Sequence, residues 1–223
     1  MGIHERKTRE REERKRLILE CTKALIIERG VEAVTMKDIA KKVELSKATL
    51  YLYFQSKEAI LEEILNEAGD FFINYVESRM SPSDSGLQAI RVLWMSYIEI
   101  YGESRDIFVM FGIKNHIDPD FPFIIDDSMD KKGNSPFRLN EMIVNVLKRG
   151  VSDGTLDPAL KPDRVARIVL MITSGIIDTV ARLPVQLRDT KLILAEMKST
   201  FEIVLRGLAA EGCDRSLLVL ADK

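Results

Sequence analysis

The sequence predicts an all-α fold, in which a small N-terminal head of three helices precedes a larger C-terminal helical domain, with about nine helices in total. Apolar residues recur mainly at intervals of three and four, and the period-two alternation that marks strands is rare. The chain has 223 residues, of which 46% are hydrophobic, so it can bury a substantial core. Helix-breaking stretches separate the periodic segments, most clearly at residues 80–86.

Two helices are expected before residue 44. An apolar stripe over residues 12–29 ends at Gly30, and glycine commonly terminates helices. Thr35 can cap a second helix that reaches Val43, and Asp38 suits a weak capping box because its side chain is shorter than the usual Glu. Each of these signals lies within four residues of the helix end that it predicts.

A short link, Glu44-Leu45, separates this second helix from a third one over residues 47–54, for which Ser46 is a good N-cap. A fourth helix begins at Ser56 and reaches about Val76. Further helices are expected at residues 87–101, 105–115, 135–151, 163–182 and 188–210. This organisation predicts two domains, at residues 1–60 and 61–223.

Charge is distributed unevenly along the chain. The net charge is −2, but residues 1–60 carry 14 Lys and Arg against 10 Asp and Glu, whereas the remainder carries 19 against 25. A basic head on an acidic body is expected where only one end of a protein meets phosphate. No apolar run is long enough for a membrane span, and we expect a cytoplasmic protein.

The sequence lacks the common motifs of enzyme active sites. It contains no glycine-rich phosphate loop, no G-x-S-x-G motif and no His and carboxylate pair at metal-binding spacing. Cys21 and Cys213 lie almost a whole chain apart, and neither has a Cys or His neighbour at the spacing of a metal site. We therefore expect no catalytic residue, no metal and no cofactor.

The second helix, the tight link and the third helix together form a helix-turn-helix, a motif whose second helix enters the DNA major groove. The third helix carries a cation and hydroxyl groups, on Lys47, Thr49, Tyr51 and Tyr53, which can bond phosphate oxygens or base edges. Leu50 and Phe54 are expected in the core, and Tyr53 is expected to pack inward more than Tyr51.

This region resembles the tetracycline-repressor (TetR) family. The resemblance runs from Glu28-Arg29-Gly30 through Thr35, Asp38-Ile39-Ala40 and Val43 to Leu45-Ser46-Lys47-Ala48-Thr49-Leu50-Tyr51 and Tyr53-Phe54-Gln55-Ser56-Lys57-Glu58-Ala59-Ile60. It implies a dimeric transcription regulator, expected to be a repressor, that binds a palindromic double-stranded operator. It also implies a C-terminal domain that binds a small-molecule effector and forms the homodimer.

Carried over by position, the resemblance implies phosphate contacts from Thr35, Ser46, Thr49, Tyr51 and Lys57. Lys47 and Ala48 lie where bases or nearby phosphates would be read.

The sequence departs from the family pattern in two places: Leu52 is apolar where a polar residue is common, and Glu44-Leu45 replaces Gly-Val in the turn. Leu52 would either lose a phosphate contact or touch a thymine methyl. The basic tract over residues 6–16 is interrupted by acids, and it fits either an arm reaching a neighbouring groove or a solvated face of ion pairs.

Large aromatic side chains concentrate in the C-terminal domain, and such residues often line apolar ligand sites. The candidate effector-binding residues are Phe72, Trp94, Tyr97, Tyr101, Phe108, Phe111, His116 and Phe137. We expect a largely apolar effector.

The last two predicted helices carry wide apolar stripes that resemble the pair forming the dimer interface in the family. The candidate interface residues are Ile168, Ile172, Gly175, Ile176, Met197, Phe201, Val204 and Leu208. An alternative stays open, in which the protein is a DNA-binding adaptor or assembly factor whose C-terminal helices bind a protein partner instead of a ligand.

Overall fold

The computed structural model describes residues 3–103, 108, 110–113, 135–183 and 189–220, and its elements in this part of the chain are helical apart from one isolated bridge, Leu156 to Ala209. The α-helices are α1 (Ile3–Arg29), α2 (Met36–Lys42), α3 (Lys47–Tyr51), α4 (Lys57–Glu77), α5 (Gly86–Glu103), α7 (Ser135–Asp153), α8 (Pro162–Arg182) and α9 (Thr190–Leu208). A 3₁₀ turn, Arg215–Leu218, follows. The all-α prediction is confirmed.

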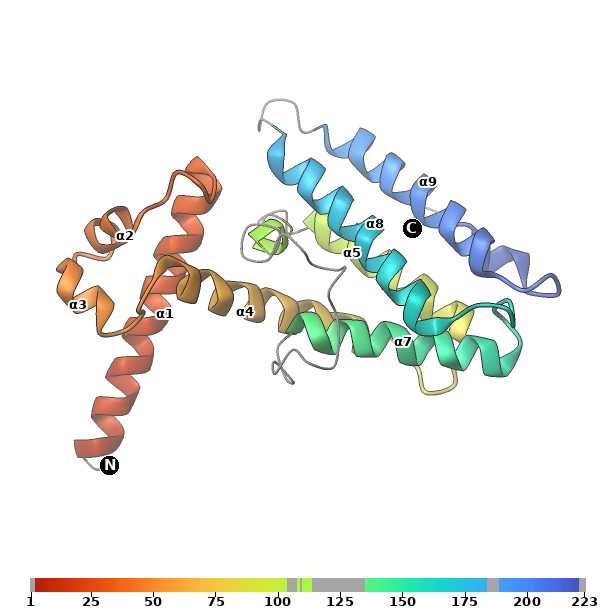
Figure 1. The fold of residues 1–223 in the computed structure, drawn as a ribbon, viewed down its shortest axis with the longest axis horizontal. Coiled ribbons are helices and arrows are strands. Elements are labelled where there is room, and N and C mark those ends of the chain that lie inside the picture. The colour runs from red at the N-terminus through yellow and green to blue at the C-terminus, as the bar shows by residue number, and fades with distance from the viewer. Residues whose placement is uncertain (1–2, 104–107, 109, 114–134, 184–188, 221–223) are drawn as a thin grey trace.

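Figure 1 shows α1, α2 and α3 gathered at one end, α4 running away from them, and α5, α7, α8 and α9 at the other end. The first group, with the beginning of α4, encloses its own hydrophobic cluster, which we call the head core. Its buried members include Ile18, Ile39, Leu50, Phe54 and Ile60. Leu50 and Phe54 were expected there, and that expectation is confirmed.

A second cluster, the body core, fills the space between α4, α5, α7, α8 and α9. The two clusters divide within a single helix, because Ala68 of α4 belongs to the head core and Phe72, one turn later, belongs to the body core. The single helix α4 therefore connects the head core to the body core.

The segment around residues 108–113 also contacts both cores. Phe108 is buried in the body core, Met110 and Ile113 are buried in the head core, and Phe111 packs against both. Head and body are therefore joined by two different parts of the chain.

Two helix lengths differ from the sequence-based prediction. α1 begins at Ile3, nine residues before the predicted start, and the ion pairs Arg6–Glu10 and Arg9–Glu13 follow the i,i+4 spacing that supports an exposed helix. α3 ends at Tyr51, and the amides of Leu52 and Tyr53 instead bond carbonyls three residues back, as in a 3₁₀ turn.

The C-terminal segment lies on the body. Leu220 is buried, its amide donates to Glu202 at 2.8 Å, and Arg91 of α5 donates to the carbonyl of Val219 at 3.2 Å. In the described residues, no helix is both long and apolar enough to cross a membrane.

Candidate nucleic-acid interface

The start of α2 is held by the predicted capping box. The Thr35 hydroxyl accepts from the amide of Asp38 at 3.3 Å, and the Asp38 carboxylate accepts from the amide of Thr35 at 3.0 Å and from its hydroxyl. These hydrogen bonds, first the one from the Thr35 hydroxyl, lower the pKa of Asp38. The capping-box prediction is confirmed, although Asp38 replaces the usual longer Glu.

The turn between α2 and α3 is a Schellman motif. The amide of Leu45 donates to Ala40 at 2.9 Å and that of Glu44 donates to Lys41 at 3.3 Å, so two carbonyls at the end of α2 are satisfied. This geometry requires a left-handed residue at position 44, and Glu44 has φ +56°. The Gly that the family commonly has here accepts that conformation without a Cβ penalty, whereas Glu44 does not.

The first turn of α3 is fixed by hydroxyl groups. The Ser46 hydroxyl accepts from the amide of Thr49 at 3.0 Å, and it lies 2.8 Å from the Thr49 hydroxyl. Ser46 is therefore the N-cap, as predicted. A capped first turn holds the exposed residues that follow it in fixed positions.

One side of α3 faces outward. Lys47 and Ala48 are exposed, Tyr51 is 42% exposed and Leu52 is 71% exposed. The Lys47 ammonium lies 5.8 Å from the centre of the Tyr51 ring, so the two side chains pack along the helix. Tyr53 instead packs against the head core, and the expectation that it turns inward is confirmed.

Two predicted phosphate contacts lie off α3. Thr35 is exposed at the N-terminus of α2, with its hydroxyl already bonded to Asp38. Lys57 is partly buried at the start of α4 and donates to the carbonyl of Val31 at 3.0 Å. That bond uses one of the three N–H donors of the Lys57 ammonium. The seven DNA-contact assignments stay predictions.

Sequence reasoning missed a contact between α1 and the end of α3. A guanidinium nitrogen of Arg11 donates to the carbonyl of Leu52 at 3.3 Å, and its centre lies 5.5 Å from the centre of the Tyr53 ring. The ammonium of Lys15 lies 5.9 Å from the centre of the Phe54 ring. The four-residue spacing of Arg11, Lys15 and the core residue Leu19 is the signal that pointed to this face.

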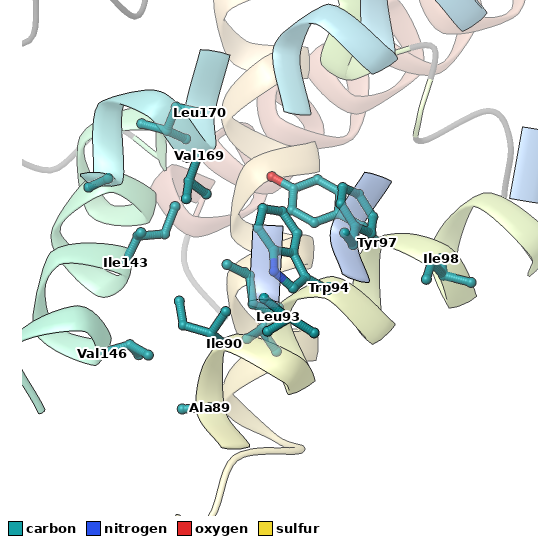
Figure 2. Close-up of a cluster of buried hydrophobic side chains, with 14 of the residues drawn as sticks. Ala89, Ile90, Leu93, Trp94, Tyr97, Ile98, Ile143, Val146, Val169 and Leu170 are labelled. Carbon is teal, nitrogen blue, oxygen red and sulfur yellow. The ribbon is translucent and has the colours of Figure 1, made fainter. Parts of the chain in front are cut away.

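The aromatic residues predicted to bind an effector lie inside the body. Figure 2 shows Trp94 and Tyr97 projecting from α5 into the layer that holds Ile143 of α7 and Val169 of α8. Trp94 has no exposed surface, and its ring stacks on Phe201 of α9 with centroids 4.3 Å apart. Phe72 lies 4.3 Å from Tyr97 and 5.6 Å from Phe111, and Tyr101 lies 5.0 Å from Phe108.

Polar atoms inside this layer are few. Tyr97 is hydrogen-bonded to Thr173 of α8, and burial raises the pKa of the Tyr97 phenol. The indole Nε1 of Trp94 has no hydrogen-bond partner among the described residues. Phe137 of α7 is partly buried, and His116 lies outside the described residues.

A cleft of about 500 Å³ lies elsewhere, between α4 and α7. Its lining mixes the apolar side chains of Ile73 and Met142 with the charged groups of Glu77 and Arg149. None of the predicted effector-binding residues is part of this lining.

Three residues predicted at a dimer interface are in the protomer's own core. Met197 and Phe201 are 1% exposed and Leu208 is 7% exposed, so these interface assignments are wrong. The stripe they form faces α5, as the stacking of Phe201 on Trp94 shows. Of the remaining candidates, Ile168 and Gly175 are exposed and Ile172, Ile176 and Val204 are partly buried. On α8 and α9, the exposed apolar side chains that sequence reasoning missed are Met171, Leu192 and Ile203.

An all-helical chain that presents α3 in this way defines a helix-turn-helix DNA-binding protein. The family model described as "Bacterial regulatory proteins, tetR family" matches residues 18–64, which span the head. The HTH-type transcriptional repressor KstR2 of Mycolicibacterium smegmatis is 26% identical over 155 residues, covering 68% of this chain and 72% of that protein.

Solved structures show the same fold. The ketosteroid transcriptional regulator KstR2 of Mycobacterium tuberculosis matches with a TM-score of 0.58 and 24% identity, covering 89% of this chain and 96% of that one. The fatty acid degradation regulator FadR from Bacillus halodurans matches with a TM-score of 0.64 and 14% identity, covering 86% and 94%. The match over residues 18–64 identifies the head of this chain as the DNA-binding domain of the TetR family of transcription regulators.

Proposed function

We infer that the protein is a dimeric repressor that acts in the cytoplasm, binds a palindromic operator, and is released from it by a small, largely apolar molecule. The observation that carries this proposal is the outward side of α3, where Lys47, Ala48 and Tyr51 are exposed on a helix whose first turn is capped by Ser46. A side chain held in this way meets base edges at a small entropic cost.

The dimer is supported by apolar side chains exposed on the two last long helices. On α8, Ile168 is 44% exposed and Met171 is 40% exposed, and on α9, Leu192 is 58% exposed and Ile203 is 69% exposed. Large apolar side chains that gather on a surface are costly to leave in water. A second copy of the chain, related by a twofold axis, would cover these faces and place two α3 helices on half-sites about 34–36 Å apart.

The effector site is proposed at the aromatic cluster around Trp94. A buried N–H without a partner costs about 1–3 kcal/mol, and an acceptor on a bound molecule would recover this free energy at the Trp94 nitrogen. An apolar effector also suits the names of the two structural relatives, which refer to ketosteroids and to fatty acid degradation. The cleft between α4 and α7 is the second candidate site.

The direct test is selection of DNA by the wild-type protein from a random pool. A palindromic sequence with half-sites one helical turn apart, or a multiple of it, supports the proposal. In binding measurements on that duplex, Lys47→Ala should reduce specific affinity by about 1–3 kcal/mol, the range for one base contact. Lys148→Ala, an exposed lysine on α7, serves as the control. A pool without any enriched sequence would contradict the assignment.

A further inference from the structure

The exposed N-terminal half of α1 carries charges that are sorted by face. Ile18 is the first buried residue of α1, so residues 3–17 extend the helix beyond the head core by roughly 20 Å at 1.5 Å per residue. Figure 1 shows this half running past α3 and past the beginning of α4.

One face of this segment is cationic. Lys7, Arg11 and Arg14 precede the buried Ile18 by eleven, seven and four residues, and this spacing places all four on the same side of a helix. Arg11 and Lys15 bind the end of α3 and the turn that follows it, through the contacts with Leu52, Tyr53 and Phe54. The cationic face is therefore turned toward the side of the head on which α3 lies.

Two acids of the segment pair with cations on other faces of the helix. Glu10 pairs with Arg6 at 3.0 Å and Glu13 pairs with Arg9 at 3.6 Å, on faces turned away from Ile18. No ion pair within the described residues engages Lys7 or Arg14, and both side chains are exposed. One face of the segment is therefore solvated and ion-paired. The other face leaves the cations of Lys7 and Arg14 available on the side where α3 lies.

We propose that the N-terminal half of α1 is a second DNA-binding element, whose Lys7 and Arg14 bind phosphates of the duplex next to the half-site read by α3. Arg11 and Lys15 position this arm by holding it against the end of α3. The proposal rests on the proposed function, because it takes the outward side of α3 as the side that meets DNA. Phosphate contacts of this kind add affinity and salt dependence without reading sequence.

The length of the arm determines which DNA it reaches. Roughly 20 Å of helix corresponds to about six base pairs at 3.4 Å each. In the proposed complex the arm runs along the duplex away from the half-site, so the phosphates that it contacts are lost when the duplex is trimmed to the half-sites.

The test compares two double variants on two duplexes. Lys7→Ala/Arg14→Ala removes two cations from the proposed arm surface, and Arg6→Ala/Arg9→Ala removes two cations from the ion-paired face of the same helix. Each is measured on the duplex selected by the wild-type protein, once trimmed to the half-sites and once extended by ten base pairs on each side. Circular dichroism establishes that both variants keep their helix content.

On the extended duplex, Lys7→Ala/Arg14→Ala should lower the slope of log affinity against log salt by about 1.8 per protomer, since each lost phosphate contact contributes about 0.9. On the trimmed duplex it should bind nearly as the wild type does, and Arg6→Ala/Arg9→Ala should stay close to the wild type on both. Equal losses of DNA affinity in the two variants, or a loss that does not depend on duplex length, would contradict the proposed DNA-binding role of the N-terminal half of α1. Neither result would affect the assignment of α3 as the reading helix. A selection with the wild-type protein that enriches no sequence overturns the proposed function itself.

Discussion

Gly86 of α5 and Gly150 of α7 meet backbone to backbone. A Cβ on Gly86 would lie 2.1 Å from the Cα of Gly150 and 2.2 Å from its nitrogen, distances that no adjustment of a side chain can relieve. The amide of Gly86 also donates to the Asp153 carboxylate at 2.7 Å, so the start of α5 is fastened to the end of α7 at this crossing.

Gly86→Ala should therefore lower the free energy of unfolding by at least about 1–3 kcal/mol, the usual cost of overpacking. The control is Gly102→Ala in the same helix, where an added Cβ meets nothing within 4 Å. Replacing glycine in an exposed helix usually stabilises by roughly 0.5–1 kcal/mol. Urea unfolding measures the stability of both variants. A Gly86→Ala protein as stable as the wild type would mean that α5 and α7 can move apart at this crossing without cost.

Glu44→Gly should stabilise the protein. The left-handed conformation costs an L-residue about 1–2 kcal/mol, and the extra freedom of glycine in the unfolded chain returns about 0.4–1 kcal/mol of that, so we expect a net gain near 0.5–1 kcal/mol. Glu44→Ala keeps the Cβ and removes the charge, which makes it the matched control. If both variants melt at the same temperature, the change in stability comes from removing the charge of Glu44 and not from relieving backbone strain.

The Asp153 carboxylate should make stability depend on pH in the acid range. Burial alone would raise its pKa, but hydrogen bonds from the Thr155 hydroxyl and from the amides of Gly86 and Thr155 outweigh burial and lower it. A lowered pKa means that this stabilisation is present above the unfolded pKa, near 3.9, and is lost as the pH falls through the folded value.

The melting temperature of Asp153→Asn should therefore lie below that of the wild type at pH 6, and the difference should shrink between pH 5 and pH 3. Glu141→Gln, an exposed carboxyl on α7, is the control, and its melting curve should follow that of the wild type across the range. A constant difference for Asp153→Asn would rule out the ionised carboxylate as its cause.

The dimer proposal predicts different outcomes for two neighbouring residues of α9. Ile203→Asp changes an exposed side chain and should give a folded monomer, whereas Phe201→Asp places a charge in the body core beside Trp94 and should prevent folding. Ile27→Asp alters an exposed isoleucine of α1 and should leave the dimer intact. Light scattering with circular dichroism separates these outcomes, and a wild-type monomer at micromolar concentration contradicts the proposal.

Trp94 is the single tryptophan, so its fluorescence reports on one place. An apolar ligand that enters the aromatic cluster must disturb the stack with Phe201, and its binding should change the emission saturably. The same compound should weaken operator binding by a factor within the roughly 5–150 typical of allosteric coupling. If a compound weakens operator binding while the Trp94 emission stays constant, the cleft between α4 and α7 becomes the preferred effector site.

Local signals in the sequence predicted much of the head. The capping residues Thr35 and Ser46, the terminator Gly30 and the inward residues Leu50 and Phe54 were all identified before the structure, because each depends on residues within about four positions along the chain. The ends of the long helices α4, α5, α7, α8 and α9 were predicted to within about two residues for the same reason.

Contacts between distant residues required the tertiary structure. Hydrophobicity is the same for a stripe that faces the protomer core and one that faces a partner, so periodicity could not tell that Phe201 stacks on Trp94 while Ile203 is exposed. The arrangement of Arg11 against Leu52 joins residues 41 positions apart. The sequence by itself determined most helix ends, apart from the start of α1 and the end of α3. The packing of the helices determined which face of each is left to bind something else, because burial depends on neighbours that only the folded chain brings together.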